Sequence, residues 1–296
     1  CTGKLVLPGF NEAEVLPSAH QNPAYTGDGI PIAEQAGAFV DWDSFCLRIM
    51  GPLCGMGDRS KFDPLTHADC AILVDLTGKR FVAEPLVPRI DPFDTGHIII
   101  QHLKGKSFFL YSANMLKKII VDTQQSVKRG DSDVFGMPPL PPYEEIDSWF
   151  EDAIAKGRRE VAKADTVEAL AEQIGLDPAV LKETVERYNA ACAAGEDWDC
   201  FKDPATMVPL SEGPFYAMSS KLGTDGAFGG VRVNADMQAY STDGGLVDGL
   251  FVTGDFASGR HTVMSGVKRQ VLNDMSWALS SGFLAGTNAA KVLDQI

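Results

Sequence analysis

Hydrophobic residues with helical spacing mark the middle of the chain. The residues of one apolar face are Leu181, Val185 and Tyr188. Asp177 followed by Pro178 is typical of a helix start, because the aspartate accepts amide hydrogen bonds and proline fits the first turn. Gly195 is placed to end the helix in a left-handed conformation. The pattern therefore predicts a helix between Asp177 and Gly195.

A second helix is predicted just before it. Asp165 and Glu168 provide an acidic start, and Gly175 provides an end. Upstream, the prolines between Pro138 and Pro142 separate this helical stretch from the preceding part of the chain. We expect a hinge or a subdomain seam there.

Short apolar runs joined by turn residues predict β-hairpins. Cys70–Asp75 and Thr77–Val82 flank one turn, and Val231–Asn234 and Met237–Tyr240 flank another at Ala235-Asp236. Asp243-Gly244-Gly245 is a further turn before an apolar strand. From residue 213 onward the pattern is therefore one of strands and glycine turns.

The last quarter of the chain carries the most specific pattern. The strand Leu250–Val252 runs into Gly254-Asp255, and a helix rich in small residues follows after a glycine-rich turn. A strand that ends in glycine and an acid is typical of a nucleotide cofactor site, since the acid reaches sugar hydroxyls while glycine lets the backbone approach. No strand followed by GxGxxG and a later acid is found. The sequence thus predicts part of a flavin site.

A polar turn near the start precedes a helical pattern. Thr26-Gly27-Asp28-Gly29 leads into the apolar-periodic run Ile30–Ala38. This position suits either a helix cap or free amides that bind a phosphate. Both interpretations stay open.

Length and charge restrict the possible functions. A chain of 296 residues favours about two domains. The formal charge of -14 argues against nucleic acid as a partner. The most apolar stretch, Met275–Leu293, is interrupted by polar residues and predicts a buried helix with no membrane insertion. The 6 cysteines and 5 histidines show no metal-ligand spacing, so we expect free thiols and no metal site.

Several stretches together resemble the fumarate reductase and succinate dehydrogenase flavoprotein superfamily, especially its soluble flavocytochrome c fumarate reductases. The matching stretches are TGDGIPIAEQAGA (26–38), AILVDLTGKRFVAE (71–84), DTVEALAEQIGLDPAVLKETVERYNA (165–190), GPFYAM (213–218), GGVRVNADMQ (229–238) and GLFVTGD (249–255). They occur in the family's order. The resemblance therefore covers most of the chain.

The resemblance implies a mixed α+β and α/β fold, in which a Rossmann-like FAD-binding domain is interrupted by an α+β capping domain. On this map residues 1–42 and 213–296 form a partial FAD-binding domain, and residues 43–212 form the cap. Gly3 lies where the family ends a strand at the cofactor. The family's N-terminal pyrophosphate-binding segment would precede Cys1. We therefore expect FAD in the full-length protein and an inactive, cofactor-free fragment in this chain alone.

The resemblance also assigns catalytic and substrate-binding arginines. Arg269 aligns with the arginine that binds the substrate carboxylate, and Arg89 resembles the family's proton donor, with a spacing longer by one residue. Two family histidines are replaced, one by Gly226 and one by Arg48. His261, in a longer loop, is a candidate replacement. These departures predict a substrate larger than fumarate.

For the cofactor, the resemblance implies contacts on either side of the loop that joins Asp255 to Asn273. Asp255, after Gly254, replaces the family's glutamate at the ribityl hydroxyls. Asn273, Asp274 and Met275 fall where backbone amides approach the flavin ring. Thr26 and Asp28 complete the expected cofactor-binding set.

The resulting prediction is an FAD-dependent oxidoreductase that acts on a C=C bond conjugated to a carboxylate or a carbonyl. Its substrate would be a small anionic enoate, and its electron donor a haem or flavin protein or domain. One alternative is a 3-ketosteroid dehydrogenase, with Tyr216 and Tyr240 near the carbonyl. Another is a cofactor-free binding module that descends from the flavoprotein.

Overall fold

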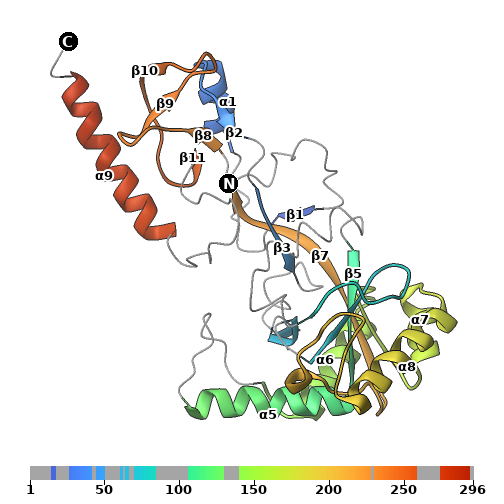
Figure 1. The fold of residues 1–296 in the computed structure, drawn as a ribbon. Coiled ribbons are helices and arrows are strands. Elements are labelled where there is room, and N and C mark those ends of the chain that lie inside the picture. Colours follow the sequence, from blue (N-terminus) through green and yellow to red (C-terminus); the bar gives the residue numbers. More distant parts are fainter. Residues whose placement is uncertain are drawn as a thin grey trace. The chain divides into compact units, whose positions relative to one another are not determined.

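A computed structural model describes most of the chain as two compact units, which we treat separately (Figure 1). The described residues are 15–17, 27–41, 45–50, 61–62, 64–66, 70–84, 106–129, 140–227, 230–258 and 274–293. One unit comprises Cys1–Arg48 and Gly223–Ile296, and the other comprises Ile49–Leu222. The sequence places these boundaries at 42/43 and 212/213. The assignment of the units to flavin binding and substrate capping stays a prediction.

The unit Ile49–Leu222 is built on an antiparallel sheet. Its long strands are β5 (Lys106–Ser112) and β7 (Phe215–Ala227), which pair from Lys106 opposite Lys221 to Ser112 opposite Phe215. β4 (Ile72–Val74) pairs with β5, and β6 (Val161–Ala164) pairs with β7. Strand β7 runs on past Leu222 to Ala227, and its further partners are β1 (Val15–Pro17) and β3 (Phe45–Met50), which lie wholly or mostly within the segment Cys1–Arg48.

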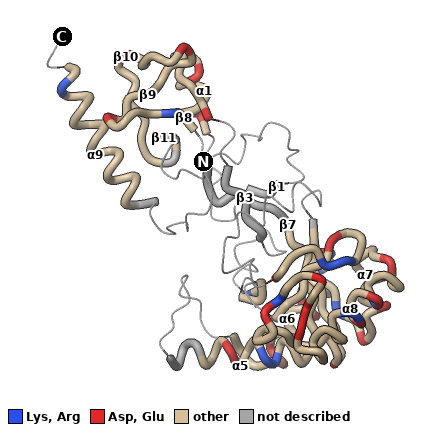
Figure 2. The backbone as a smooth tube through the Cα atoms, viewed as in Figure 1, with Lys and Arg blue, Asp and Glu red and all other residues tan. Residues whose placement is uncertain are grey.

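Helices pack against this sheet and complete its core. They are α5 (Ala113–Arg129), α6 (Tyr143–Ala155), α7 (Val167–Ile174) and α8 (Pro178–Ala194), with the 3-10 helix η1 (Pro204–Thr206) after them. Phe150 and Tyr216 are fully buried in this core, with ring centroids 4.7 Å apart. Figure 2 shows many Asp and Glu residues on the outer sides of α6, α7 and α8. The acidic residues of these helices thus lie on the solvent side of an apolar core.

The helix ends follow their local signals. Asp177 accepts hydrogen bonds from the amides of Ala179 and Val180, and Gly195 ends α8 with a φ of 73°. Gly175 ends α7 with a φ of 76°. Both predicted helices are therefore confirmed. The N-cap of α7 is Thr166 rather than Asp165, because the Thr166 hydroxyl accepts the hydrogen bond from the Ala169 amide.

The predicted hairpin over residues 70–82 is wrong in its second strand. β4 pairs with β5 instead, and the segment after it forms no described strand, only an isolated bridge between Val74 and Arg80. The turn itself forms, with the Asp75 carboxylate accepting hydrogen bonds from the amides of Thr77 and Lys79. Between this turn and Glu84 the chain forms no further strand of the sheet, but the Glu84 carboxylate accepts a hydrogen bond from the Leu73 amide of β4.

The other unit, Cys1–Arg48 with Gly223–Ile296, contains small sheets and a long helix. Its elements are α1 (Gly29–Gln35), β2 (Val40–Asp41), β8 (Gly230–Arg232), β9 (Gln238–Tyr240), β10 (Leu246–Phe251), η2 (Gly254–Phe256), β11 (Ala257–Ser258) and α9 (Asp274–Leu293). β8 pairs with β2 on one side and with β11 on the other. The predicted hairpin around Ala235-Asp236 is confirmed by the antiparallel bridge between Val233 and Ala239.

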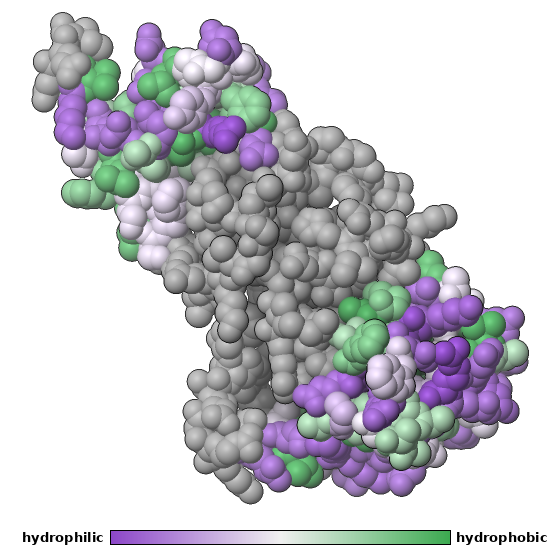
Figure 3. Space-filling model, viewed as in Figure 1, coloured by the Kyte–Doolittle hydropathy of each residue, from purple (hydrophilic) through white to green (hydrophobic). Residues whose placement is uncertain are grey.

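Helix α9 contacts the rest of its unit along one side. Ser281, Ala285 and Asn288 are buried, whereas Leu279 and Phe283 are 69% and 75% exposed. Figure 3 shows hydrophobic surface along this helix beside hydrophilic residues. The expectation of a buried helix is therefore wrong for the described structure. Within the ranges given above, no helix is long and apolar enough to cross a membrane.

Candidate functional site

The described part of the predicted cofactor site centres on η2, directly after β10. Gly254 opens η2 with a φ of 61°, a conformation that favours glycine. Its amide donates to the Ser281 hydroxyl at 3.0 Å, and its carbonyl accepts from the Trp277 indole N–H at 3.0 Å. Two side chains of α9 therefore fix the backbone of Gly254, the residue next to Asp255.

Helix α1 begins against this same element. A Cβ built on Gly29 would lie 3.0 Å from two atoms of the Phe256 ring, so only glycine lets the first turn of α1 approach η2 this closely. Asp28 precedes the helix and is exposed, and its carboxylate makes no capping hydrogen bond. The structure thus brings together the segments around Asp28 and Gly254, which the sequence assigns to one cofactor site.

A small apolar core holds these segments in place. Ile30 and Ala33 of α1 pack with Val231 of β8 and Ala239 of β9, and Phe256 packs against this cluster. β11 continues directly from η2 and pairs in parallel with β8. The loop after β10 is therefore anchored by strand pairing on one side and by α9 on the other.

The remaining predicted site residues are described only in part. For Arg48, Gly226, Asp255, Asp274 and Met275 the structure gives the backbone, in β3, β7, η2 and α9. The residues outside the described ranges are Gly3, Thr26, Arg89, His261, Arg269 and Asn273. Their roles stay predictions. In the described ranges no group of His, Cys, Asp or Glu is arranged to hold a metal ion.

Tyr216, a candidate in the steroid interpretation, is buried and belongs to a partly buried network of polar side chains. Its hydroxyl donates to the Asp147 carboxylate at 2.7 Å and lies 2.6 Å from the Tyr143 hydroxyl. Burial raises the pKa of Tyr216 well above its ordinary value, and these two hydrogen bonds raise it further. Lys163 pairs with Asp147 at 2.6 Å. The Tyr216 hydroxyl is therefore engaged within the core, which speaks against contact with a substrate carbonyl.

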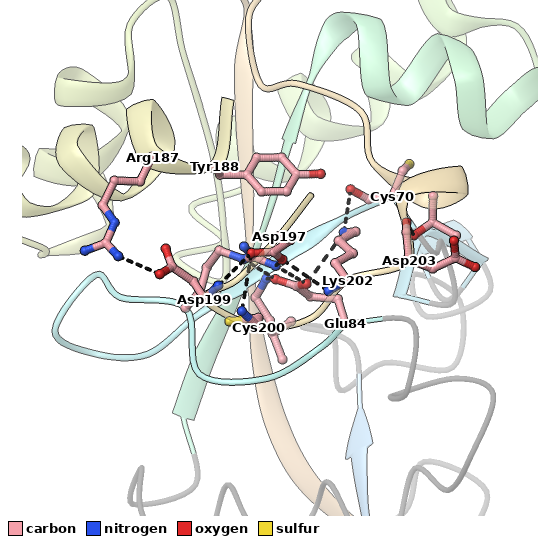
Figure 4. A network of polar contacts seen from close by, with 12 residues as sticks. Cys70, Glu84, Arg187, Tyr188, Asp197, Asp199, Cys200, Lys202 and Asp203 are labelled. Carbon is pink, nitrogen blue, oxygen red and sulfur yellow. Dashed lines mark hydrogen bonds and ion pairs between the residues drawn. The ribbon is translucent and has the colours of Figure 1, made fainter. Parts of the chain in front are cut away.

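A buried cluster of charges lies in the unit Ile49–Leu222, and sequence reasoning missed it (Figure 4). Arg80 binds both carboxylate oxygens of Glu84, at 2.8 and 2.7 Å, and reaches Asp197 at 2.8 Å. Lys202 is fully buried and donates to the carbonyl oxygens of Ala71 and Cys70, at 2.5 and 3.2 Å. Arg80 and Glu84 are close in sequence, but 117 residues separate Arg80 from Asp197, so no spacing rule joins the whole cluster.

The cluster shifts the pKa of its members in opposite directions. Burial lowers the pKa of Lys202, although the Glu84 carboxylate opposes this shift. Burial would also lower the pKa of Arg80, but Glu84 and Asp197 raise it above its ordinary value. Burial raises the pKa of the Cys200 thiol to about 11. Burial likewise raises the pKa of the Cys70 thiol to about 11, so both buried thiols stay protonated at neutral pH. Cys70, Cys192 and Cys200 form no disulfide.

Comparison with known proteins identifies the family of the chain. Residues 12–268 match the family model described as an FAD binding domain. The urocanate reductase of Eggerthella lenta is 33% identical over 271 residues, which is 90% of this chain and 38% of the relative. The fumarate reductase (cytochrome) of Shewanella frigidimarina is 28% identical over 269 residues, or 91% of this chain and 40% of the relative. The chain thus spans less than half the length of these relatives.

Solved structures support the same fold. The open conformation of a flavocytochrome c3 fumarate reductase matches with a TM-score of 0.60 and 25% identity, covering 93% of this chain and 41% of that one. A 3-ketosteroid delta1-dehydrogenase from Sterolibacterium denitrificans matches with a TM-score of 0.65 and 20% identity, covering 96% and 49%. At this identity the second match concerns the fold alone. The predicted mixed helix-and-sheet fold is confirmed.

Proposed function

The chain belongs to the FAD-binding domain family of flavoproteins, and from this premise we propose that the full protein is an oxidoreductase acting on a C=C bond conjugated to a carboxylate or a carbonyl. The main support is the 33% identity with a urocanate reductase over 90% of the chain. Fumarate and urocanate both carry a carboxylate conjugated to a C=C bond. An enoate is therefore the substrate class that these relatives favour.

The residues around η2 suit the cofactor that the family binds. Gly254 has a positive φ, and a Cβ at this position would meet no described atom within 4 Å, so the backbone is open to approach. We assign Asp255 to the ribityl hydroxyls and the amides of Asn273, Asp274 and Met275 to the ring. FAD, when bound and reduced, supplies the hydride for one carbon of the double bond.

The chain's arginines complete the proposed chemistry. Arg269 holds the substrate carboxylate with its planar fork, a charge-assisted contact of about 1.5 to 3 kcal/mol. Arg89 delivers the proton to the other carbon, so that one hydride and one proton saturate the bond. Arg48 and His261 contact further anionic or polar groups, and Gly226 leaves room for a substrate larger than fumarate. In this assignment residues 43–212 form the cap over the substrate.

The electron donor of the proposed enzyme is a haem or flavin protein or domain. Relatives named fumarate reductase (cytochrome) support a haem donor. A steroid dehydrogenase is the second candidate, supported by 26% identity with the 3-oxosteroid 1-dehydrogenase of Mycolicibacterium smegmatis. The engaged hydroxyl of Tyr216 counts against it. A cofactor-free binding module is the third.

Flavin absorbance of the full-length protein, and the compound that reoxidises its reduced flavin, distinguish these three proposals. We expect a yellow protein that a reduced viologen bleaches and that urocanate or another enoate reoxidises. Reoxidation only by a 1,4-diene-3-ketosteroid would favour the steroid enzyme. A colourless full-length protein that takes up no added FAD would contradict the oxidoreductase proposal and favour the binding module.

A further inference from the structure

A pair of exposed aromatic rings stands on the loop after α8. Trp198 and Phe201 are 75% and 74% exposed, and their ring centroids lie 6.3 Å apart at an interplanar angle of 78°. The Trp198 indole N–H donates to the Glu196 carboxylate at 3.0 Å. Large aromatic rings are enriched at the centres of protein interfaces, where they contribute much of the binding energy. Two of them together on one loop therefore suggest a contact surface.

The loop that carries these rings is held from below. Asp197 is buried, and its carboxylate accepts hydrogen bonds from the amides of Asp199, Cys200 and Lys202 at 3.2 to 3.3 Å. The same carboxylate binds Arg80 at 2.8 Å. The loop is thus fixed to the buried charged cluster, and the rings are displayed on a preorganised backbone. Preorganisation lowers the entropy lost on binding.

The backbone at Phe201 is strained. Its φ of 55° lies in the left-handed region, which a bulky residue adopts at a cost and glycine adopts freely. Packing of a buried side chain could offset the energy of this strain, but the Phe201 ring is exposed. Strain without a packing benefit points to a function for the exposed ring.

The surroundings of the rings are acidic. Glu196, Asp199 and Asp203 on this loop are exposed, and among the described residues Asp199 alone of the three pairs with a cation, Arg187, at 2.5 Å. The chain as a whole carries a formal charge of -14. The faces of aromatic rings attract cations, most of all guanidinium groups, and nearby carboxylates strengthen this attraction. The charge of this surface complements a basic partner.

We propose that Trp198 and Phe201 form a docking surface for a basic segment of a partner protein, whose arginine side chains stack on the rings within the acidic rim. An anionic membrane surface would be repelled by the same carboxylates. This surface does not depend on flavin chemistry.

Calorimetric titration of the full-length protein with a short peptide of alternating arginine and glycine tests the proposal. The matched peptide has citrulline in place of arginine. We expect the arginine peptide to bind about tenfold more tightly, and Trp198→Ala and Phe201→Gly each to weaken its binding about tenfold. The control Phe283→Ala removes a ring that is equally exposed on α9 and leaves binding unchanged.

Three results would overturn the proposal. Equal affinity in all variants would mean diffuse attraction to the net charge, and no measurable binding would mean that no basic segment docks there. Binding to phosphatidylcholine vesicles that is lost in Trp198→Ala would assign the rings to a membrane surface instead. Phe201→Gly keeps the test sound, because glycine suits the left-handed backbone and the variant is expected to melt at a higher temperature than the wild type.

Discussion

The carboxylate of Glu84 accepts a hydrogen bond at 3.1 Å from the backbone amide of Leu73, on the side of β4 opposite to β5. On the same side Lys202 donates to the carbonyl oxygen of Ala71. These buried side chains therefore satisfy backbone groups that a neighbouring strand would otherwise bind. Unpaired edge groups invite association with other strands, so the charged cluster protects this edge.

Replacing Lys202 should destabilise the protein strongly. In Lys202→Met the carbonyls of Cys70 and Ala71 lose their donor, and the buried Glu84 loses a cation 3.6 Å away. Removing one partner from a buried charged group leaves an uncompensated charge, so we expect the free energy of unfolding to fall by about 3 kcal/mol. Urea denaturation measures this change. The control Lys182→Met breaks an exposed ion pair with Glu168 and should leave the denaturation midpoint unchanged. Equal effects of the two variants would contradict a stabilising role for the buried Lys202.

Asp197 should make stability depend on acidic pH. Burial alone would raise the pKa of Asp197, but Arg80 and the amides of Cys200 and Lys202 hold it below its ordinary value. A lowered folded-state pKa means that the stabilisation is complete above the unfolded value of about 3.9 and is lost as the pH falls below it. The stability difference between the wild type and Asp197→Asn should therefore be constant near neutral pH and shrink in this acidic range. A difference that does not depend on pH would exclude this ionisation.

Phe201→Gly should stabilise the fold. The residue sits at a φ of 55° with an exposed side chain, so glycine relieves the strain and little packing is lost. We expect the free energy of unfolding to rise by about 1 kcal/mol. Phe201→Ala keeps a Cβ in the left-handed region and should give no such gain. Chemical denaturation of the two variants in parallel tests this, and a loss of stability in Phe201→Gly would show that the ring packs.

Gly29→Ala should disturb the predicted flavin site. The added Cβ would meet the Phe256 ring at 3.0 Å and push α1 away from η2. We expect a loss of stability of about 1 kcal/mol and less flavin in the purified full-length protein. Gly282→Ala in α9 is the matched control, because its Cβ meets no described atom within 4 Å and alanine favours a helix. Normal flavin content in Gly29→Ala would show that the approach of Gly29 to Phe256 is not needed for cofactor binding.

Local features of the fold could be predicted from sequence because neighbouring residues determine them. The ends of α8 at Asp177 and Gly195 depend on one capping side chain and one left-handed glycine. The turn at Asn234 depends on its own side chain, which accepts hydrogen bonds from the amides of Asp236 and Gln238. Such contacts span a few residues, so the pattern alone reveals them.

Contacts between distant segments could not be predicted in this way. The hairpin expected at Cys70–Val82 fails because β4 finds its partner in β5, a choice made by packing. The pairing of Arg80 with Asp197 spans 117 residues. At the candidate site, the glycine and acid pattern singled out Gly254, whose role in cofactor binding stays a prediction. Its attachment to Ser281 and the approach of Gly29 to Phe256 required the structure.

Reoxidation kinetics of the reduced full-length protein test the central proposal most directly. Arg269 is assigned to the substrate carboxylate, and lysine keeps its charge but loses the planar fork. With urocanate or another enoate we expect the wild type to reoxidise rapidly and Arg269→Lys to do so about a hundredfold more slowly, with an unchanged flavin spectrum. Equal rates in the two proteins, or a wild type that no enoate reoxidises, would contradict the proposed function.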